Sequence, residues 1–417
     1  MFVSVKQVIV EETLKVLQRK SRLLKLLKLS CLTFLILLST TATPLIGQAQ
    51  DSLSTAKRYQ EALELMNGFQ FDRALNLLSE CHIHDQENTA YLLKIAYCNF
   101  QMGRYPDASL FYKKVLSIDS LNTNALSSLG SIYERMNNYK EAESQYLQLI
   151  SIDSTNSYYF KRMGYASMRL NKPLQGIAFF IRAHELNEGD VEIIDQLSDI
   201  YLAMGELEYA ETVLQKGLNI DPNNIKLLYN QARLFQKQKD YPTVAFAVEK
   251  AMAQGDTSDY YQMMLGVAYL RIDSLDRSIF HLERIVSRGK DSDRTHHYLG
   301  LAYKELDNME KSVEHLEKAI ELGISEQMGT YQSDLASIHM SENQFKPAIN
   351  RYRKAYQYEP KSEYLFHLAR ACDLYYKDKK PALKYYDQYL ASNDQKFREY
   401  SSKRIKQLKE IIHLSKR

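Results

Sequence analysis

The sequence has no tryptophan among its 417 residues, and it contains only 15 glycines, 8 prolines and 4 cysteines. So few glycines and prolines argue against an all-β fold with many tight turns. A charged fraction of 25% and a mean hydropathy of −0.41 exclude a polytopic membrane protein and a disordered chain. The chain also lacks a glycine-rich phosphate loop, a Gly-x-Ser-x-Gly motif and a His-Glu-x-x-His motif. We therefore predict that the protein is not an enzyme and uses no cofactor.

The cysteines do not form a disulfide framework, because an odd number of them follows residue 50: Cys81, Cys98 and Cys372. Cys81 and Cys98 could pair across neighbouring helices in an oxidising compartment, but we expect buried thiols. Residues 81–85 (Cys-His-Ile-His-Asp) are the one compact group of metal-ligand types in the sequence. No second group follows at a zinc-like spacing, so we predict no metal site.

Charge is distributed unevenly along the chain. Residues 1–50 carry seven Lys/Arg against two Glu, and residues 396–417 carry eight Lys/Arg against two Glu. The segment between them has a net charge of −8, although the whole chain has +3. Nucleic-acid binding needs a clustered basic surface, so we predict no nucleic-acid partner for this segment.

The first fifty residues have the order of a secretory signal peptide. Basic residues precede the apolar run 29–38 (LSCLTFLILL), and small and polar residues with Pro44 follow it. Gly47 and Ala49 predict cleavage after Ala49, so residues 1–49 are the predicted leader; an uncleaved membrane anchor is the alternative. The apolar run is shorter than the ~20 residues of a bilayer span. In both cases we expect the rest of the chain to be exported, to the periplasm or cell envelope.

Three segments share the pattern Leu-Gly-x-x-Tyr: residues 129–133, 265–269 and 299–303. Their starts lie 136 and 34 residues apart, and 136 is four times 34. A 34-residue period that begins at Thr55 predicts eight repeats without a gap. A ninth repeat follows two inserted residues, and a tenth needs one extra residue in its inner turn. The ten predicted repeats are 55–88, 89–122, 123–156, 157–190, 191–224, 225–258, 259–292, 293–326, 329–361 and 362–396.

Two positions of the repeat are almost always small. Position 8 is Gly, Ala or Ser in all ten repeats, and position 20 is small in every repeat except the sixth, which has Val244. Small side chains allow two helix backbones to approach closely, and the bulky residues at position 24 fill the space around them. The residues at position 8 are Ala62, Ala96, Gly130, Gly164, Ser198, Ala232, Gly266, Gly300, Ala336 and Ala369.

With these motifs the sequence resembles the tetratricopeptide repeat (TPR) family. The family's Leu-Gly-x2-Tyr occurs in three repeats, and its Ala-x3-Tyr/Phe occurs, for example, as Ala108/Tyr112 and Ala142/Tyr146. The family's early Trp is missing, and its closing Pro occurs only at Pro222 and Pro360. The resemblance covers residues 55–396 and implies an all-α, right-handed superhelix of about ten helix-turn-helix repeats.

Residues 397–417 follow the last repeat and form an amphipathic pattern with one apolar face. A repeat array needs a more polar element over its last apolar face, so we predict a basic capping helix here. A basic arm for an acidic partner or a lipid surface is the alternative.

The resemblance implies that positions 2, 5, 9 and 12 of the first helices line a concave face. Aromatic and Arg side chains there suit a peptide or helix of a partner protein. The family's carboxylate clamp, Lys at position 5 with Asn at position 9, occurs in no repeat. We expect the pair His296-His297 to be solvated or in this groove. The predicted partner-binding residues are Tyr59, Leu63, Tyr97, Phe100, Tyr158, Lys161, Tyr165, Asp199, Lys226, Tyr229, Arg233 and Tyr260.

The sequence therefore predicts a non-catalytic protein-interaction scaffold of the cell envelope. Its partner would be an envelope protein or peptide, and it would contact the membrane only through an uncleaved N-terminal segment. The alternative is an envelope protein that binds a glycan or small ligand, with groove tyrosines stacked on sugar rings. A processing enzyme with an unrecognised site is a third possibility.

Overall fold

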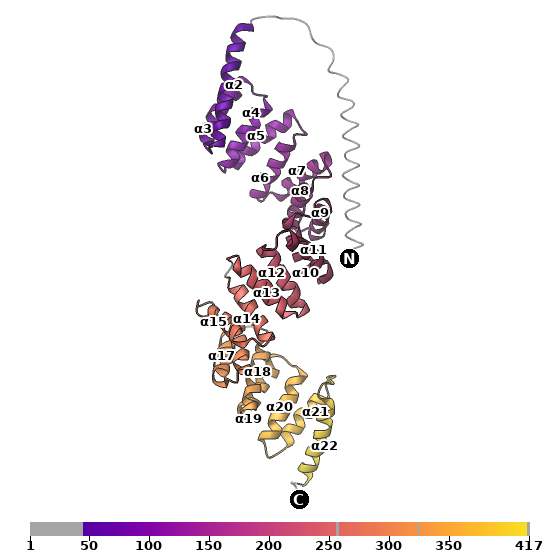
Figure 1. The fold of residues 1–417 in the computed structure, drawn as a ribbon. Coiled ribbons are helices and arrows are strands. Elements are labelled where there is room, and N and C mark those ends of the chain that lie inside the picture. The colour runs from indigo at the N-terminus through magenta and orange to yellow at the C-terminus, as the bar shows by residue number, and fades with distance from the viewer. Residues whose placement is uncertain (1–44, 256–257, 324–325, 415–417) are drawn as a thin grey trace. The chain divides into compact units, whose positions relative to one another are not determined.

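The computed structural model describes residues 45–255, 258–323 and 326–414, so most of the predicted leader lies outside the described residues. Within these ranges it contains twenty-one α-helices and no strand, which confirms the predicted all-α class (Figure 1). The described residues divide into two compact units, one up to Pro222 and the other from Asn223 onwards. No helix in the described part of the chain is both long enough and apolar enough to span a bilayer.

The first unit consists of five helix pairs, in which each helix packs against the next along the chain. α2 begins at Leu45 and therefore runs through Ala49, where cleavage is predicted. The helices are α2 (Leu45–Asn67), α3 (Phe71–His84), α4 (Thr89–Gln101), α5 (Tyr105–Ile118), α6 (Thr123–Arg135), α7 (Tyr139–Ile152), α8 (Ser157–Arg169), α9 (Pro173–Leu186), α10 (Val191–Met204) and α11 (Leu207–Ile220).

The second unit has five further helix pairs and a final single helix. Its helices are α12 (Ile225–Gln238), α13 (Tyr241–Ala253), α14 (Asp259–Arg271), α15 (Leu275–Val286), α16 (Asp293–Glu305), α17 (Met309–Leu322), α18 (Met328–Ser341), α19 (Phe345–Tyr358), α20 (Ser362–Tyr375), α21 (Lys380–Leu390) and α22 (Arg398–Leu414).

Local sequence explains where the helices begin and end. Five first helices start after an Asn or Asp whose side-chain oxygen accepts a backbone N–H of the first turn: Asn88, Asn122, Asn156, Asp190 and Asn224. The turn inside each of the first nine pairs contains one residue with φ between 57° and 79°, always at position 15 of the repeat. Gly, Asn and Asp tolerate this left-handed conformation best, and they occupy seven of the nine positions. The tenth turn is one residue longer, and Tyr376 has an ordinary φ of −86°.

The contact between positions 8 and 24 sets the distance between the two helices of a pair. A Cβ atom placed on Gly130 would lie 2.6 Å from the ring of Tyr146, which is fully buried. A Cβ on Gly164 would lie 2.7 Å from the ring of Phe180. These distances are shorter than van der Waals contact, so the large residue at position 24 requires a small residue at position 8.

Position 20 adds a hydrogen bond to the same contact in two repeats. The Ser278 hydroxyl donates to the carbonyl oxygen of Gly266 at 2.7 Å, and the Ser312 hydroxyl donates to that of Gly300, also at 2.7 Å. Both hydroxyls are buried, and a buried hydroxyl without a partner is costly. Serine is therefore a small residue that suits position 20.

The last helix, α22, covers the tenth helix pair, as predicted for a cap. Ile405 and Leu408 are buried, and the ring of Phe397 stacks on Phe366 with a centroid distance of 3.9 Å. On its polar side, Arg404 pairs with the buried Asp373 at 2.7 Å. An apolar stripe and one ion pair thus close the end of the second unit.

We predict that Gly130→Ala lowers the stability of the first unit, because the new methyl group collides with the Tyr146 ring. Overpacking lowers the free energy of unfolding by about 1–3 kcal/mol, and the higher helix propensity of Ala offsets about 1 kcal/mol of this loss. The midpoint of urea unfolding, followed by circular dichroism, should therefore fall. Gly68→Ala is the control, since its Cβ would meet no atom closer than 3.6 Å. Equal midpoints for the two variants would contradict this packing account.

Candidate partner-binding face

The first helices of neighbouring repeats contact each other through residues that the sequence places on the concave face. The rings of Tyr59 and Tyr91 lie 5.0 Å apart between α2 and α4. Lys161 of α8 reaches Glu192 of α10, and Tyr229 of α12 packs on Tyr260 of α14. These contacts involve positions 2, 3 and 5 of the repeats. We call the residues at positions 2, 5, 9 and 12 of the first helices the first-helix face.

At the N-terminal end of the first unit this face is aromatic and apolar. Tyr59 and Leu63 are partly buried, whereas Tyr97 is 40% exposed. Phe100 is partly buried, and the guanidinium of Arg135 lies 5.3 Å from its ring centroid. A cation at this distance is attracted by the face of the ring. This part of the face thus presents rings and a guanidinium held against one of them.

Further along the first unit, Lys161 is the centre of an ion-pair network. Its ammonium lies 2.9 Å from Asp190 and 2.9 Å from Glu192, and the Tyr165 hydroxyl donates to Glu192 at 2.8 Å. Burial disfavours the charge of Lys161, but the hydrogen bonds that its ammonium donates to both carboxylates outweigh this effect and raise its pKa. Burial likewise opposes the charge of Glu192, but hydrogen bonds from Lys161 and Tyr165 lower its pKa. Two of the predicted contact residues are therefore held in fixed positions by the protein itself.

The other two predicted residues of this region are accessible. Tyr158 is 38% exposed, and Asp199 is exposed on the neighbouring first helix. The guanidinium of Arg162 lies about midway between two rings, 6.0 Å from the centroid of Tyr158 and 5.8 Å from that of Tyr165. Tyr158 is thus the exposed aromatic beside the ordered network.

In the second unit the face carries an aromatic and basic cluster of Tyr229, Arg233 and Tyr260. Tyr229 and Tyr260 meet edge to face at 5.4 Å, and the Arg233 guanidinium lies 5.4 Å from the Tyr229 centroid. Tyr260 is 53% exposed, and Lys226 is exposed one turn before Tyr229. Burial and the neighbouring Tyr229 hydroxyl raise the pKa of Tyr260 to about 12, so its hydroxyl is neutral.

The prediction for His296 and His297 was wrong, because both side chains are buried. His297 Nε2 lies 2.7 Å from Asp334, and His296 lies 3.0 Å from Asp291 and 2.9 Å from His315. For His296 a signal was present in the sequence, since position 4 is a buried apolar residue in repeats two to six; His297 is at position 5, where no such pattern holds. Those residues are Leu92, Leu126, Phe160, Ile194 and Leu228.

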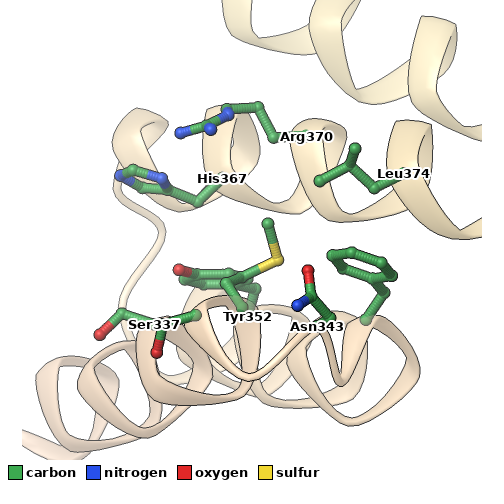
Figure 2. A pocket seen from close by; sticks show the side chains of 9 residues that line it. Ser337, Asn343, Tyr352, His367, Arg370 and Leu374 are labelled. Atoms are coloured by element: carbon green, nitrogen blue, oxygen red, sulfur yellow. The ribbon is translucent and has the colours of Figure 1, made fainter.

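A pocket of about 410 Å³ lies between the ninth and tenth helix pairs. Figure 2 shows His367 and Arg370 of α20 across from Tyr352 and Ser337, with Leu374 at the other end. Ser337, Met340 and Arg370 are at positions 9, 12 and 9 of their repeats and so belong to the first-helix face, but Asn343 comes from the turn between α18 and α19, and sequence analysis did not predict the pocket. It is lined by Ser337, Met340, Ser341, Asn343, Phe345, Tyr352, His367, Arg370 and Leu374.

Among the described residues, the cysteines form no disulfide and the segment 81–85 forms no metal site. Cys81, Cys98 and Cys372 are buried free thiols, as expected. Burial raises the pKa of Cys98 and of Cys372 to about 11, so both thiols are protonated and weakly nucleophilic at neutral pH. Among the described residues, no three His, Cys, Asp or Glu side chains are grouped so that they could hold a metal ion.

Comparison with known proteins gives a family match. The family model for the tetratricopeptide repeat matches residues 123–156, 191–224 and 294–322, and the first two ranges coincide with the third and fifth predicted repeats. No curated protein sequence matches the chain.

Several solved structures are similar at low sequence identity. PilF of Pseudomonas aeruginosa is 20% identical over 51% of this chain and 96% of its own, with a TM-score of 0.44. YrrB, described as a TPR protein with an unusual peptide-binding site, is 22% identical over 42% of this chain and 91% of its own, with a TM-score of 0.37. Yeast Tom70 is 11% identical over 86% of this chain and 96% of its own, with a TM-score of 0.39.

We predict that Lys161→Met destabilises the protein by about 1–3 kcal/mol at pH 7, because Asp190 and Glu192 lose a charged hydrogen-bond partner. The pKa of Glu192 is lowered in the folded state, so its stabilisation is present above about pH 4.3 and is lost as the pH falls further. Urea unfolding should therefore show a smaller difference from wild type at pH 3 than at pH 7.

The control is Lys140→Met, because Lys140 is an exposed lysine of α7 with no ion pair among the described residues. It should change the free energy of unfolding by less than about 0.5 kcal/mol. If the difference between Lys161→Met and wild type were the same at both pH values, the ion pair with Glu192 would not be its cause.

Proposed function

Because the chain is a tetratricopeptide repeat protein, we propose that it is a non-catalytic scaffold of the cell envelope that binds a peptide or helix of a partner protein. The binding surface is the first-helix face, and the partner docks on a surface that is already formed. A preformed surface loses little conformational entropy on binding, so most of that loss is on the partner's side.

The observation that carries this proposal is the cluster of Tyr229, Arg233 and Tyr260. Tyr and Arg are the residue types most enriched at the energetic centres of protein interfaces. Tyr260 is about half exposed although it already packs on a second ring, so it offers a large aromatic surface at low entropic cost. Such a cluster fits an extended segment or helix better than a small metabolite, which needs an enclosed cavity.

Export is supported by the N-terminal sequence, in which basic, apolar and small segments follow one another. We propose that residues 1–49 direct the chain out of the cytoplasm and are removed. The scaffold then acts in the periplasm or cell envelope.

We predict that Tyr260→Ala lowers the recovery of a protein partner from envelope fractions at least about fivefold, while the thermal unfolding curve stays unchanged. The matched control is Tyr358→Ala, which removes a 60%-exposed tyrosine from the end of the second helix α19. Its recovery should equal that of wild type. Saturable glycan binding without any stoichiometric protein partner would contradict the scaffold proposal.

The mature N-terminus provides a separate test of export. Mass spectrometry of the protein from the envelope fraction should find Gln50 as the first residue. An intact N-terminus from Met1 in that fraction would show an uncleaved anchor, and protein found only in the cytoplasm would contradict export.

A further inference from the structure

One cation in the lining of the pocket between the ninth and tenth helix pairs, and one beside it, have no carboxylate partner among the described residues. Arg370 lines the pocket and forms no ion pair with any described residue; its guanidinium carbon lies 6.0 Å from the Phe366 ring centroid. The Lys304 ammonium donates to the Ser337 hydroxyl at 3.2 Å, beside the pocket, and forms no ion pair in the described part of the chain either. Charges of one sign at a cleft raise the local concentration of ligands of the opposite sign, so these two cations favour an anionic ligand.

The carboxylates near this pocket are already engaged. Asp334 lies 2.7 Å from His297, and Glu363 lies 2.7 Å from Lys396. His367 adds no further charge at neutral pH, because burial lowers its pKa. Its ring stacks on Tyr352 at 5.5 Å and forms part of the pocket wall. Charges of both signs act on the pocket wall: burial raises the pKa of Tyr352, Arg370 lowers it, and Asp334 and Glu363 raise it. Arg370 and Lys304 differ from these carboxylates in having no ion-pair partner among the described residues.

The pocket also has an apolar part. Along α20, His367 and Arg370 are followed one turn later by Leu374, which is 57% exposed and lies at the opposite end of the pocket in Figure 2. Phe345 and Met340 add two further apolar side chains to the lining. Exposed leucines are common singly, but here one stands beside two other apolar groups in a concave site.

We propose that this pocket binds a partner segment in which a carboxylate stands next to a large apolar side chain. The carboxylate pairs with the planar fork of Arg370, and the apolar side chain packs on Phe345, Met340 and Leu374. A volume of about 410 Å³ is sufficient for two such side chains and is within the range of ligand pockets. The inference rests on the proposed scaffold function and names the chemistry of one segment that it binds.

Met340 provides a direct reporter, because it lines the pocket. The experiment uses the full chain with carbon-13-labelled methionine methyl groups, and Met340→Leu assigns the Met340 signal. Three peptides are titrated: acetyl-Phe-Glu-amide, acetyl-Gly-Phe with a free C-terminal carboxylate, and acetyl-Phe-Gln-amide. We expect the Met340 methyl signal to shift with a carboxylate peptide and to stay in place with the glutamine peptide at the same concentration. A shift with only one of the two acids shows whether the carboxylate comes from a side chain or a chain end.

Arg370→Gln should weaken binding of the acidic peptide at least about tenfold, the loss expected for one charge-assisted contact. The matched control is Arg353→Gln, an exposed arginine of α19 that does not line the pocket, and it should bind as wild type does. An unchanged thermal unfolding curve shows that Arg370→Gln is folded. Equal binding of the Glu and Gln peptides, an unaffected Arg370→Gln variant, or no shift at 10 mM peptide would overturn the proposal. These results are independent of partner recovery with Tyr260→Ala, so failure here leaves the scaffold proposal to its own test.

Discussion

The structure depends on one steric constraint, the contact between a small residue at position 8 and a large residue at position 24 of each helix pair. Gly130 and Tyr146 show how tight it is, since a single added methyl carbon would lie 2.6 Å from the ring. Because interiors are close-packed, such a contact fixes how near the two helices lie and leaves little freedom for either to shift. The second helix of each pair therefore holds the first helix in place. This contact fixes each first helix, and with it the residues of the first-helix face that the helix carries, against its own second helix.

Two tyrosines of the Leu-Gly-x-x-Tyr motif make contacts between successive repeats. The Tyr of the Leu-Gly-x-x-Tyr motif reaches back to the preceding repeat: Tyr303 donates to Glu283 at 2.6 Å and accepts from Lys311 at 3.3 Å. Burial has the larger effect and the carboxylate of Glu283 the next; both raise the pKa of Tyr303, so its hydroxyl stays a neutral donor. Tyr269 repeats this arrangement with Glu249 one repeat earlier. The motif thus links neighbouring repeats through a partly buried hydrogen bond, which costs more to break than an exposed one.

The fold could be predicted from the sequence because it depends on residue size at fixed spacing, which a period of 34 displays directly. Pairings between particular polar side chains could not be predicted from the sequence. The buried pairs Gln262–His281 and His296–His315 join positions 4 and 23, and only the structure shows that these positions meet. The first-helix face was predicted by position alone, so the ion pairs of Lys161 were not foreseen. The pocket at Arg370 was also missed, since it combines two helix pairs and the turn that contains Asn343.

We propose that a partner protein contacts the first-helix face and not the exposed surface of the second helices. The most direct measurement is photo-crosslinking in intact cells, with p-benzoylphenylalanine in place of Tyr260 or of Tyr358. Both positions are exposed tyrosines of the second unit, so the substitution is comparable at the two sites. If this proposal holds, we expect a discrete protein adduct from position 260 and none from position 358. An adduct from position 358 alone, or no protein adduct from either position, would contradict it.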